Sequence, residues 1–172
     1  ALLGAKSAMI SRVGDEQMVQ FLRNQLSAVG CDVSQVRKDP ERLTGLVFLS
    51  IRDKEQFPLL FYRQDCADMA LCAEDIDEAF IARCRSLIIT GTHFSTDKVY
   101  QASKKALTFA KKHGVVRALD IDYRPVLWGL TGRGDGESRY IASDAVSAHL
   151  QTVLPDFDLI IGTEEEWQIA GG

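Results

Sequence analysis

The chain has 172 residues, of which 46% are hydrophobic and 26% charged, and its formal net charge is -4. This length suffices for one domain with a buried core, and the acidic balance excludes the basic footprint typical of nucleic-acid binding. No apolar run approaches the ~20 residues of a membrane helix, and Lys6 interrupts the apolar start, so we expect no membrane association and no secretory signal.

The N-terminal part predicts a strand followed by a helix. Residues 7–13 (SAMISRV) are typical of a strand, and residues 16–29 form a helical pattern that ends at Gly30. The middle of the chain predicts a hairpin, because residues 44–51 and 57–63 are apolar runs on either side of the polar RDKEQ.

We interpret this hairpin as a small antiparallel lid, inserted at about residues 36–65 into an otherwise parallel sheet. An amphipathic pattern at residues 74–84 then predicts a helix that leads back to the main sheet. From Ser86 onward the elements alternate: strands at 86–90, 115–121 and 157–162, and helices at 97–113, from the cap Ser143 through Leu150, and from Thr163. This alternation predicts right-handed crossovers and an α/β fold with a parallel sheet.

Polar residues follow each of the last three strands. In open parallel sheets, ligands bind beyond the carboxyl ends of the strands, and these ends share one edge. Gly91 follows the first strand and lets a ligand approach the backbone. Asp122 and Arg124 follow the second strand, and Glu164–Glu166 follow the third. The sequence therefore predicts a ligand site at this edge.

Arg124 is the sharpest candidate in this set. Its planar guanidinium can hold a carboxylate or a phosphate by paired hydrogen bonds, and Pro125 stiffens the chain that carries it. We expect residues 126–128 (VLW) to turn back and anchor this loop on the core. The alternative is a surface ion pair between Arg124 and Asp122. Arg63, at the end of the predicted lid, is a weaker candidate for the same task.

The acidic run at 164–166 also has two interpretations. Acids in a first helical turn interact favourably with the helix dipole, and the strand-end position makes one of them a magnesium-water ligand beside a phosphate. His93 could bind substrate, but we interpret it as a packed or solvated histidine. The glycine-rich residues 132–138 (GRGDGES) follow no strand and lack the Lys-Ser/Thr of a phosphate-binding loop, so they predict a flexible loop.

The cysteines predict a reduced, cytoplasmic protein. Cys31, Cys66, Cys72 and Cys84 contain no Cys-x-x-Cys pair, and the three histidines are scattered along the chain. Cysteines and histidines with this spacing are a poor ligand set for a metal ion. We therefore interpret the cysteines as packing residues with free thiols.

The order of SRVGDEQMVQFLRNQLSAVGCDVS, TGLVFL, FYR, DIDYRPVLW and IIGTEEEW resembles the ribokinase-like (PfkB) carbohydrate kinases, and within them the sugar-acid kinases. The resemblance covers essentially all 172 residues. Its most specific part is DYRPVLWG with the later GDGESRY and GTEEEW. It implies a three-layer ribokinase-like fold, with helices on both faces of a parallel sheet and a small antiparallel β lid, present here in part.

The strand-end motif of that family is Asp-x-Asn-x-Arg, which contacts the substrate and the phosphoryl region. The resemblance places it at Asp120, Asp122 and Arg124, with Asp in place of Asn at 122. The lid motif of the sugar-acid kinases, Tyr-x-Arg or Phe-Tyr-Arg, matches Phe61, Tyr62 and Arg63. The resemblance implies that Tyr62 and Arg63 bind substrate together with Gly91, Asp122 and Arg124.

The family's Asn-x-x-Glu motif organises magnesium and phosphate. It matches Thr163 to Glu166, with Thr in place of Asn, so the resemblance implies that both residues contribute to the nucleotide site and that Glu166 holds Mg2+ through water. The family's glycine-rich substrate segment is expected before Ala1. Its Gly-Ala-Gly-Asp segment, with the catalytic base, is expected after Gly172. We therefore expect the sugar-binding half of a kinase, nearly inactive alone.

The resemblance implies ATP and Mg2+ as cofactors. It implies transfer of the γ-phosphoryl of ATP to the primary hydroxyl of a keto-deoxy sugar acid, 5-dehydro-2-deoxygluconate, in inositol catabolism. Alternative substrates are 2-keto-3-deoxygluconate and fructose, and a different class is a non-catalytic sugar-binding or interaction domain. Open strand edges in the predicted lid favour a homodimer through residues 44–63.

Overall fold

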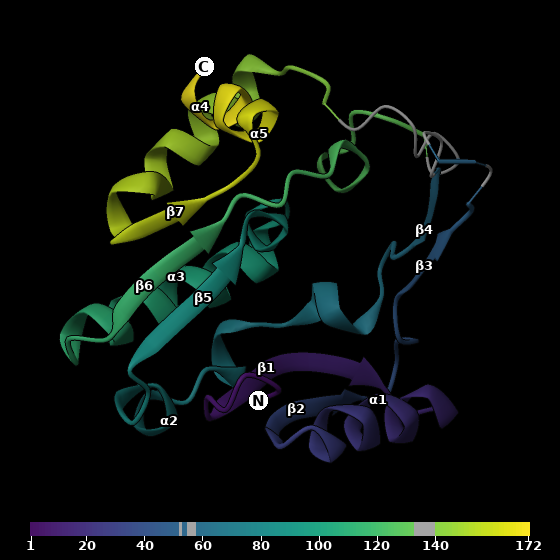
Figure 1. Ribbon diagram of the computed structural model, residues 1–172, viewed down its shortest axis with the longest axis vertical. Helices are drawn as coiled ribbons and strands as arrows, with labels where there is room; N and C mark the ends of the chain where they lie inside the picture. The colour runs from purple at the N-terminus through teal and green to yellow at the C-terminus, as the bar shows by residue number, and fades with distance from the viewer. Residues whose placement is uncertain (52, 55–57, 133–139) are drawn as a thin grey trace.

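The computed structural model describes residues 1–51, 53–54, 58–132 and 140–172 (Figure 1). The strands are β1 Ser7–Gly14, β2 Cys31–Asp39, β3 Leu46–Leu49, β4 Leu59–Tyr62, β5 Ser86–Thr90, β6 Val116–Asp120 and β7 Leu159–Ile161. The α-helices are α1 Gln17–Ala28, α2 Glu78–Ala82, α3 Asp97–Lys112, α4 Asp144–Val153 and α5 Glu164–Gly171. Single 3-10 turns are η1 Ala67–Ala70, η2 Ala73–Asp75, η3 Gly91–Phe94, η4 Pro125–Trp128 and η5 Leu154–Asp156.

The strands confirm the predicted α/β class with a small antiparallel sheet. β5, β6 and β7 form a parallel sheet in that order, β1 and β2 form a second parallel sheet, and β3 pairs with β4 antiparallel. Within the described residues the two parallel sheets are not hydrogen-bonded to each other. Figure 1 shows β1, β2 and α1 at one end, β5–β7 with α3–α5 at the other, and the β3–β4 hairpin standing to one side.

Strand β2 is an addition to the predicted elements. Its sequence, CDVSQVRKD, is mostly polar, which hides the strand from a search for apolar alternation. Ser11 of β1 lies opposite Val36, and Val36 packs with Val13 and Val19 beneath α1. The predicted lid insertion at 36–65 begins within this strand, and β3 and β4 both lie inside its limits.

The prediction of one helix at 74–84 is wrong, because a 3-10 turn and a short helix divide this segment. Asp77 begins α2 by accepting hydrogen bonds from the backbone of Ala79 at 2.9 Å and of Phe80 at 3.3 Å. Asp75, just before it, turns instead toward Arg12 of β1. Side-chain carboxylates that bond to nearby backbone compete with a continuous helix.

Helix α3 covers one face of β5 and β6, as its amphipathic pattern predicts. Val99, Ala102, Ala106 and Ala110 are buried on that side, and small residues let the helix lie close to the sheet. Gly114 takes a positive φ of 66° just after the helix, which is the usual glycine stop. The main core of the molecule lies between this helix, α4 and the strands.

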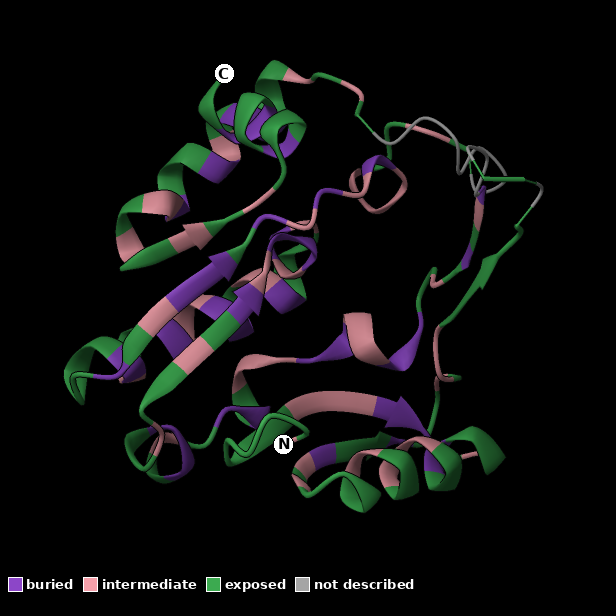
Figure 2. Ribbon diagram, in the orientation of Figure 1, coloured by how far each residue is buried: buried purple, intermediate pink, exposed green. Residues whose placement is uncertain are grey.

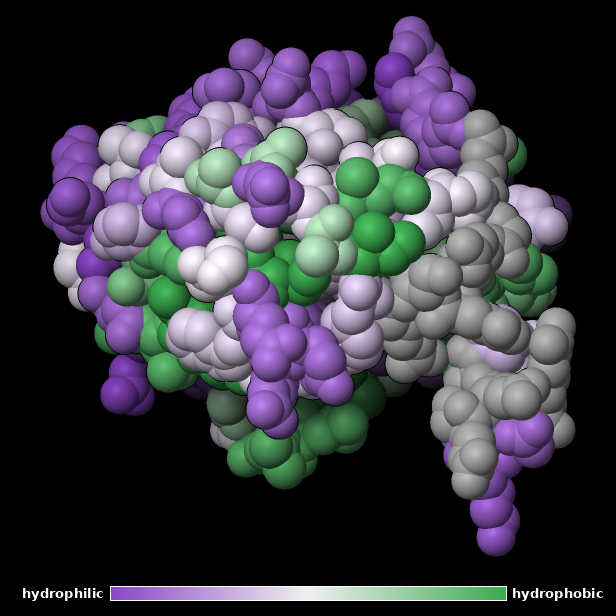
Figure 3. Space-filling view, turned by 90° about the horizontal axis from the view of Figure 1, so that it is seen from above, coloured by the Kyte–Doolittle hydropathy of each residue, from purple (hydrophilic) through white to green (hydrophobic). Residues whose placement is uncertain are grey.

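The opposite face of β5–β7 carries exposed apolar side chains, and Figure 2 shows exposed positions along these strands. Ile88 is 67% exposed, and Val116, Leu159 and Ile161 on the same face are also exposed. Figure 3 shows hydrophobic side chains gathered in patches on the face seen from above, between areas of hydrophilic side chains. An apolar face of this kind is typical of a surface that packs against further protein.

In the described part of the chain, no helix has the length and apolar character that crossing a membrane requires.

A buried ion network joins β1, β2 and η2. Arg12 of β1 donates to Asp75 from Nε at 2.6 Å and from Nη2 at 3.0 Å, and Nη1 lies 3.2 Å from Asp39 of β2. Burial opposes the ionisation of Asp75, but hydrogen bonds from Arg12 and from the Cys72 backbone outweigh it and hold its pKa below the usual value. The network therefore fixes the η1–η2 segment, which packs on β1 and α3.

We predict that Asp75→Ala lowers the free energy of unfolding by about 3 kcal/mol, because it leaves a largely buried guanidinium without its main partner. Asp15→Ala, which removes an exposed pair with Lys38, is the control and should leave the melting temperature nearly unchanged. Thermal melts of both variants measure the difference. Equal effects of the two substitutions would contradict a structural role for the network.

The same network makes stability sensitive to acid. The pKa of Asp75 is lowered in the folded state, so its stabilisation is present above the unfolded value of about 3.9 and is lost as pH falls through the folded value. We therefore expect the melting temperature to fall steeply below about pH 4. Asp75→Asn should flatten that fall, whereas an unchanged acid slope would assign it to other carboxylates.

Candidate functional site

The three strand ends of β5, β6 and β7 meet around Ile121. A Cβ on Gly91, after β5, would lie 2.1 Å from the Ile121 carbonyl oxygen, and a Cβ on Gly162, after β7, would lie 2.7 Å from Ile121 Cδ1. No side chain fits at either position without a shift of backbone or core. The predicted convergence of strand ends on one edge is therefore present, and two glycines allow it.

The chain turns sharply after β6. Asp122 has a φ of 35°, a left-handed conformation that Asp and Asn tolerate better than other non-glycine residues. Tyr123 is buried, and its hydroxyl donates to the carbonyl of Ile141 at 2.6 Å. The turn directs Asp122 and Arg124 outward while Tyr123 fixes the loop from below.

Glu166 ties this turn to helix α5. Its Oε1 accepts the Tyr123 backbone N–H at 2.9 Å, and its Oε2 accepts the Thr163 backbone N–H at 2.9 Å. Thr163 Oγ1 in turn accepts the Glu166 N–H at 3.4 Å, which completes a capping box at the start of α5. Glu166 is 5% exposed, so its carboxylate is a buried brace between two strand ends.

Arg124 is partly exposed and held on one side. Its Nη2 lies 2.7 Å from Asp122 Oδ1, Nη1 donates to the Tyr123 carbonyl at 2.8 Å, and Nη1 lies 3.8 Å from Glu166 Oε1. The ion pair between Arg124 and Asp122, which was the alternative interpretation from the sequence, is thus present. Burial raises the pKa of Asp122, with the charges of Asp120 and Glu166 in support and those of Arg124 and Arg63 in opposition.

Arg63 reaches the same edge from the end of β4. Its positive charge counts among the influences on Asp122, and it also lowers the pKa of His93, after the larger effect of burial. His93 lies in η3, and its Nδ1 is 2.9 Å from Thr90 Oγ1. Asp68, which the sequence analysis did not single out, pairs with Arg63 at 2.5 Å. The charges of both arginines therefore influence Asp122, Arg124 through a direct ion pair and Arg63 from the lid.

Tyr62 lies on the lid, where its side chain is exposed. Its ring is 61% exposed and packs edge-on against Phe48 of the neighbouring lid strand, with ring centroids 5.7 Å apart. Trp128 packs partly buried against the core, as expected of an anchor, and lies edge-on to His149. Of the glycine-rich segment 132–138 predicted as a flexible loop, residues 133–138 lie outside the described residues.

The described residues contain no group of three or more His, Cys, Asp or Glu side chains placed to hold a metal directly. The four cysteines are free thiols, as predicted. Glu166 already accepts a backbone hydrogen bond on each oxygen, and each carboxylate oxygen retains a second lone pair. The geometry fits contact with a metal-bound water and does not fit a full protein ligand set.

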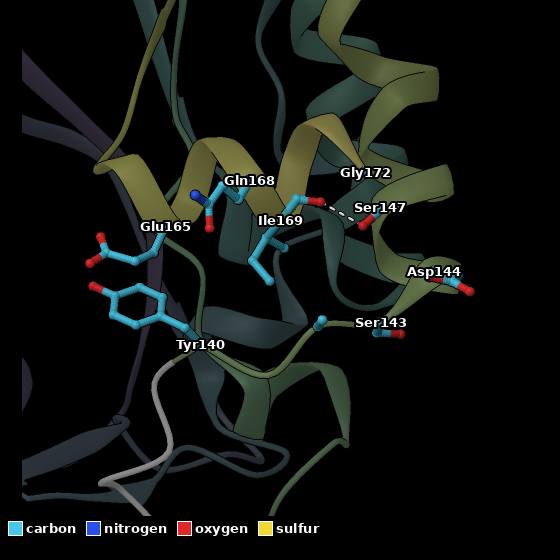
Figure 4. A pocket seen from close by; sticks show the side chains of 9 residues that line it. Tyr140, Ser143, Asp144, Ser147, Glu165, Gln168, Ile169 and Gly172 are labelled. Atoms are coloured by element: carbon cyan, nitrogen blue, oxygen red, sulfur yellow. Dashed lines mark hydrogen bonds between the residues drawn. The ribbon is translucent and has the colours of Figure 1, made fainter.

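A separate hollow of about 230 Å³ lies between α4 and α5 (Figure 4). Its polar atoms are partly used, because Ser147 Oγ donates to the Ile169 carbonyl at 2.5 Å. Tyr140 and Glu165 flank one end, with the tyrosine hydroxyl near the carboxylate in Figure 4. Of the acidic run 164–166 only Glu165 lines this hollow, and Arg124, Gly91 and Glu166 lie outside it, so the strand-end region is the stronger candidate site.

Comparison with known proteins agrees with this geometry. The model of the pfkB family carbohydrate kinases matches residues 1–172. The 5-dehydro-2-deoxygluconokinases of Halalkalibacterium halodurans and Geobacillus kaustophilus are 32% and 34% identical over 97% and 98% of this chain, and 47% of each relative's length is covered. A candidate ribokinase II from E. coli, solved in complex with ATP and Mg2+, is similar with a TM-score of 0.79 at 24% identity, covering 99% of this chain and 50% of that one.

The fold is ribokinase-like. The chain belongs to the PfkB family of carbohydrate kinases, which confirms the predicted resemblance. It spans about half the length of the curated relatives it matches.

We predict that Gly91→Ala disrupts the strand-end region, because the new methyl group meets backbone rather than a flexible side chain. The expected loss in free energy of unfolding is about 3 kcal/mol, typical of severe overpacking. Gly171→Ala in α5 is the matched control, since nothing lies within 4 Å of its added Cβ. Denaturant unfolding of both variants gives the comparison, and a tolerated Gly91→Ala would refute the close approach to Ile121.

Proposed function

We propose that the protein containing this chain is an ATP-dependent sugar kinase that phosphorylates the primary hydroxyl of a keto-deoxy sugar acid. The substrate we favour is 5-dehydro-2-deoxygluconate, which places the enzyme in inositol catabolism in the cytoplasm. Support comes from family membership and from the names of relatives that are 32% and 34% identical.

The observation that carries the proposal is the pair of guanidinium groups at one sheet edge. Arg124 follows β6, Arg63 arrives from the lid, and both act on Asp122. Two cations beside partly buried strand ends suit an anionic ligand, and a planar guanidinium matches a carboxylate by paired bonds. Each guanidinium already has an acidic partner, Asp122 for Arg124 and Asp68 for Arg63, so a sugar carboxylate would share the arginines with these acids.

Within this proposal, each residue has a physical role. Arg63 and Arg124 hold the sugar acid by its carboxylate, which fixes the orientation of the rest of the molecule. Asp122 shares Arg124 with the substrate and limits how far that side chain can move. Gly91 keeps the end of β5 free of side chains, so that the sugar can approach the backbone.

Thr163 and Glu166 would act on the nucleotide side. Glu166 would hold a water of the Mg2+ shell, and Thr163 would orient that carboxylate through the capping box. Mg-ATP supplies the phosphoryl group and neutralises charge as it transfers. The E. coli relative in complex with ATP and Mg2+ supports this choice of cofactors.

The decisive assay compares sugars in the complete protein that carries this chain. With Mg-ATP, we expect kcat/KM for 5-dehydro-2-deoxygluconate to exceed that for 2-keto-3-deoxygluconate, and both to exceed that for fructose. Preference for fructose would overturn the role of the two arginines. Absence of phosphorylation with every sugar, combined with retained sugar binding, would favour a non-catalytic binding module.

Arg124→Lys tests the paired fork in the same protein. Lysine keeps the charge but loses the planar pair of donors, so the Kd for the sugar acid should rise roughly tenfold with little change in melting temperature. Calorimetric titration measures the affinity. A large drop in melting temperature with affinity retained would show that Arg124 serves only as a structural partner of Asp122.

We also propose a homodimer through the lid. The two-stranded sheet of β3 and β4 has open edges, and Leu46, Val47, Phe48 and Leu49 are all exposed along β3. Open apolar strand edges are a common route to pairing. The lid of a second copy would cover these side chains.

Light scattering on the chain with residues 44–63 replaced by a Gly-Ser linker tests this dimer. The linker version should be monomeric, and Phe48→Lys should weaken the dimer. Ile88→Lys on the open sheet face is the matched control. A dimer that survives the linker but dissociates in Ile88→Lys would assign association to the sheet face instead.

A further inference from the structure

Asp68 is the acidic neighbour of Arg63 in the short turn after the lid. Arg63 Nε donates to Asp68 Oδ2 at 2.9 Å, and Nη2 lies 2.5 Å from the same oxygen. Both side chains are about one-fifth exposed, at 19% and 20%. In the described part of the chain no hydrogen-bond partner is found for Arg63 Nη1. Asp68 therefore occupies the Nε–Nη2 edge of the guanidinium, and the free edge is the side that carries Nη1.

The pair is held tightly by its surroundings. A Cβ on Gly45, just before β3, would lie 2.9 Å from Arg63 Cγ and 2.9 Å from Asp68 Oδ1, so the lid backbone closes directly over it. Nη2 of Arg63 also points toward Met69 Sδ at 3.6 Å. Asp68 Oδ1 is buried and has no hydrogen-bond partner among the described residues. A buried oxygen left unpaired is costly, so this position is not explained by stability alone.

The charge of Arg63 influences groups at two strand ends, which indicates that this side chain lies toward the strand-end region. The positive charge of Arg63 lowers the pKa of His93 in η3, which follows β5, and opposes the raised pKa of Asp122, which follows β6. Burial and Arg63 together lower the pKa of His93, so the imidazole beside Arg63 is neutral at physiological pH. The positive charges available to an anionic ligand at the strand ends are therefore those of Arg63 and Arg124, and His93 adds none.

We propose that Asp68 is a positioning residue, which holds Arg63 side-on so that its free edge meets the carboxylate of the sugar acid. This inference rests on the proposed function and extends it to a residue that does not touch the substrate. Without Asp68, the arginine would lose the partner that orients its guanidinium, and the end of the side chain would sample more rotamers. Ordering it beforehand lowers the entropy cost of binding the carboxylate.

The test uses steady-state kinetics of the complete protein with 5-dehydro-2-deoxygluconate and Mg-ATP. Asp68→Asn should raise KM for the sugar acid at least tenfold and change KM for ATP less than twofold. Asp65→Asn is the matched control: it makes the same charge change in the same turn, Asp65 is exposed beside Arg42, and its positive φ of 50° suits asparagine. It should stay within twofold of the wild type.

A double-mutant cycle separates positioning from general damage. If Asp68 acts through Arg63, adding Asp68→Asn to Arg63→Met should change KM for the sugar acid less than twofold. The same comparison decides the matter if Asp68→Asn alone does not fold, because the double variant removes both charges. A further rise in KM in the Arg63→Met background, or an equal rise in KM for ATP, would overturn the proposal.

The outcomes also separate this inference from the function it rests on. A wild-type protein that does not phosphorylate the sugar acid overturns both. An active wild type whose KM is unchanged by Asp68→Asn overturns only the positioning role of Asp68.

Discussion

The strand-end region depends on one buried carboxylate. Glu166 accepts the backbone N–H of Thr163 and that of Tyr123, so a single side chain fixes the start of α5 and the turn after β6 at the same time. Two charge-assisted hydrogen bonds to backbone are strong and directional. Asp122 and Arg124 flank Tyr123, and their positions follow from this brace. The site is therefore preorganised by backbone bonds rather than by contacts among its own exposed charges.

The brace works because three strand ends converge on it. Gly91 and Gly162 let β5 and β7 close around Ile121, and the parallel register brings Thr90, Asp120 and Ile161 level with one another. The lid contributes Arg63, which follows strand β4 of the antiparallel sheet and is held by Asp68 in the turn after it. One arginine is thus fixed by the sheet and the other by the lid, and a ligand between them would join the two parts.

The sequence predicts well what depends on local pattern. Apolar runs and glycine stops locate the strands and helices from residue 86 onward, and the rule for parallel sheets brings Gly91, Arg124 and Glu166 to one edge. Strand β2 is not predicted, because its exposed and half-buried positions carry similar, mostly polar residues and show no apolar alternation. The pairing of Arg63 with Asp68 and the exposed position of Tyr62 depend on how the lid turn folds back, which no periodicity encodes. The kinase chemistry came from the family resemblance, whereas the contacts of Arg63 with Asp68 and of Glu166 with Tyr123 are visible only in the structure.

The most direct test of the account is a crystal structure of the complete protein with the sugar acid bound. The account predicts that the carboxylate lies within hydrogen-bond distance, about 3 Å, of the free edge of Arg63 and of Arg124, with Glu166 still bonded to the backbone of Tyr123. A carboxylate bound away from both arginines, with only sugar hydroxyls facing the strand ends, would contradict it.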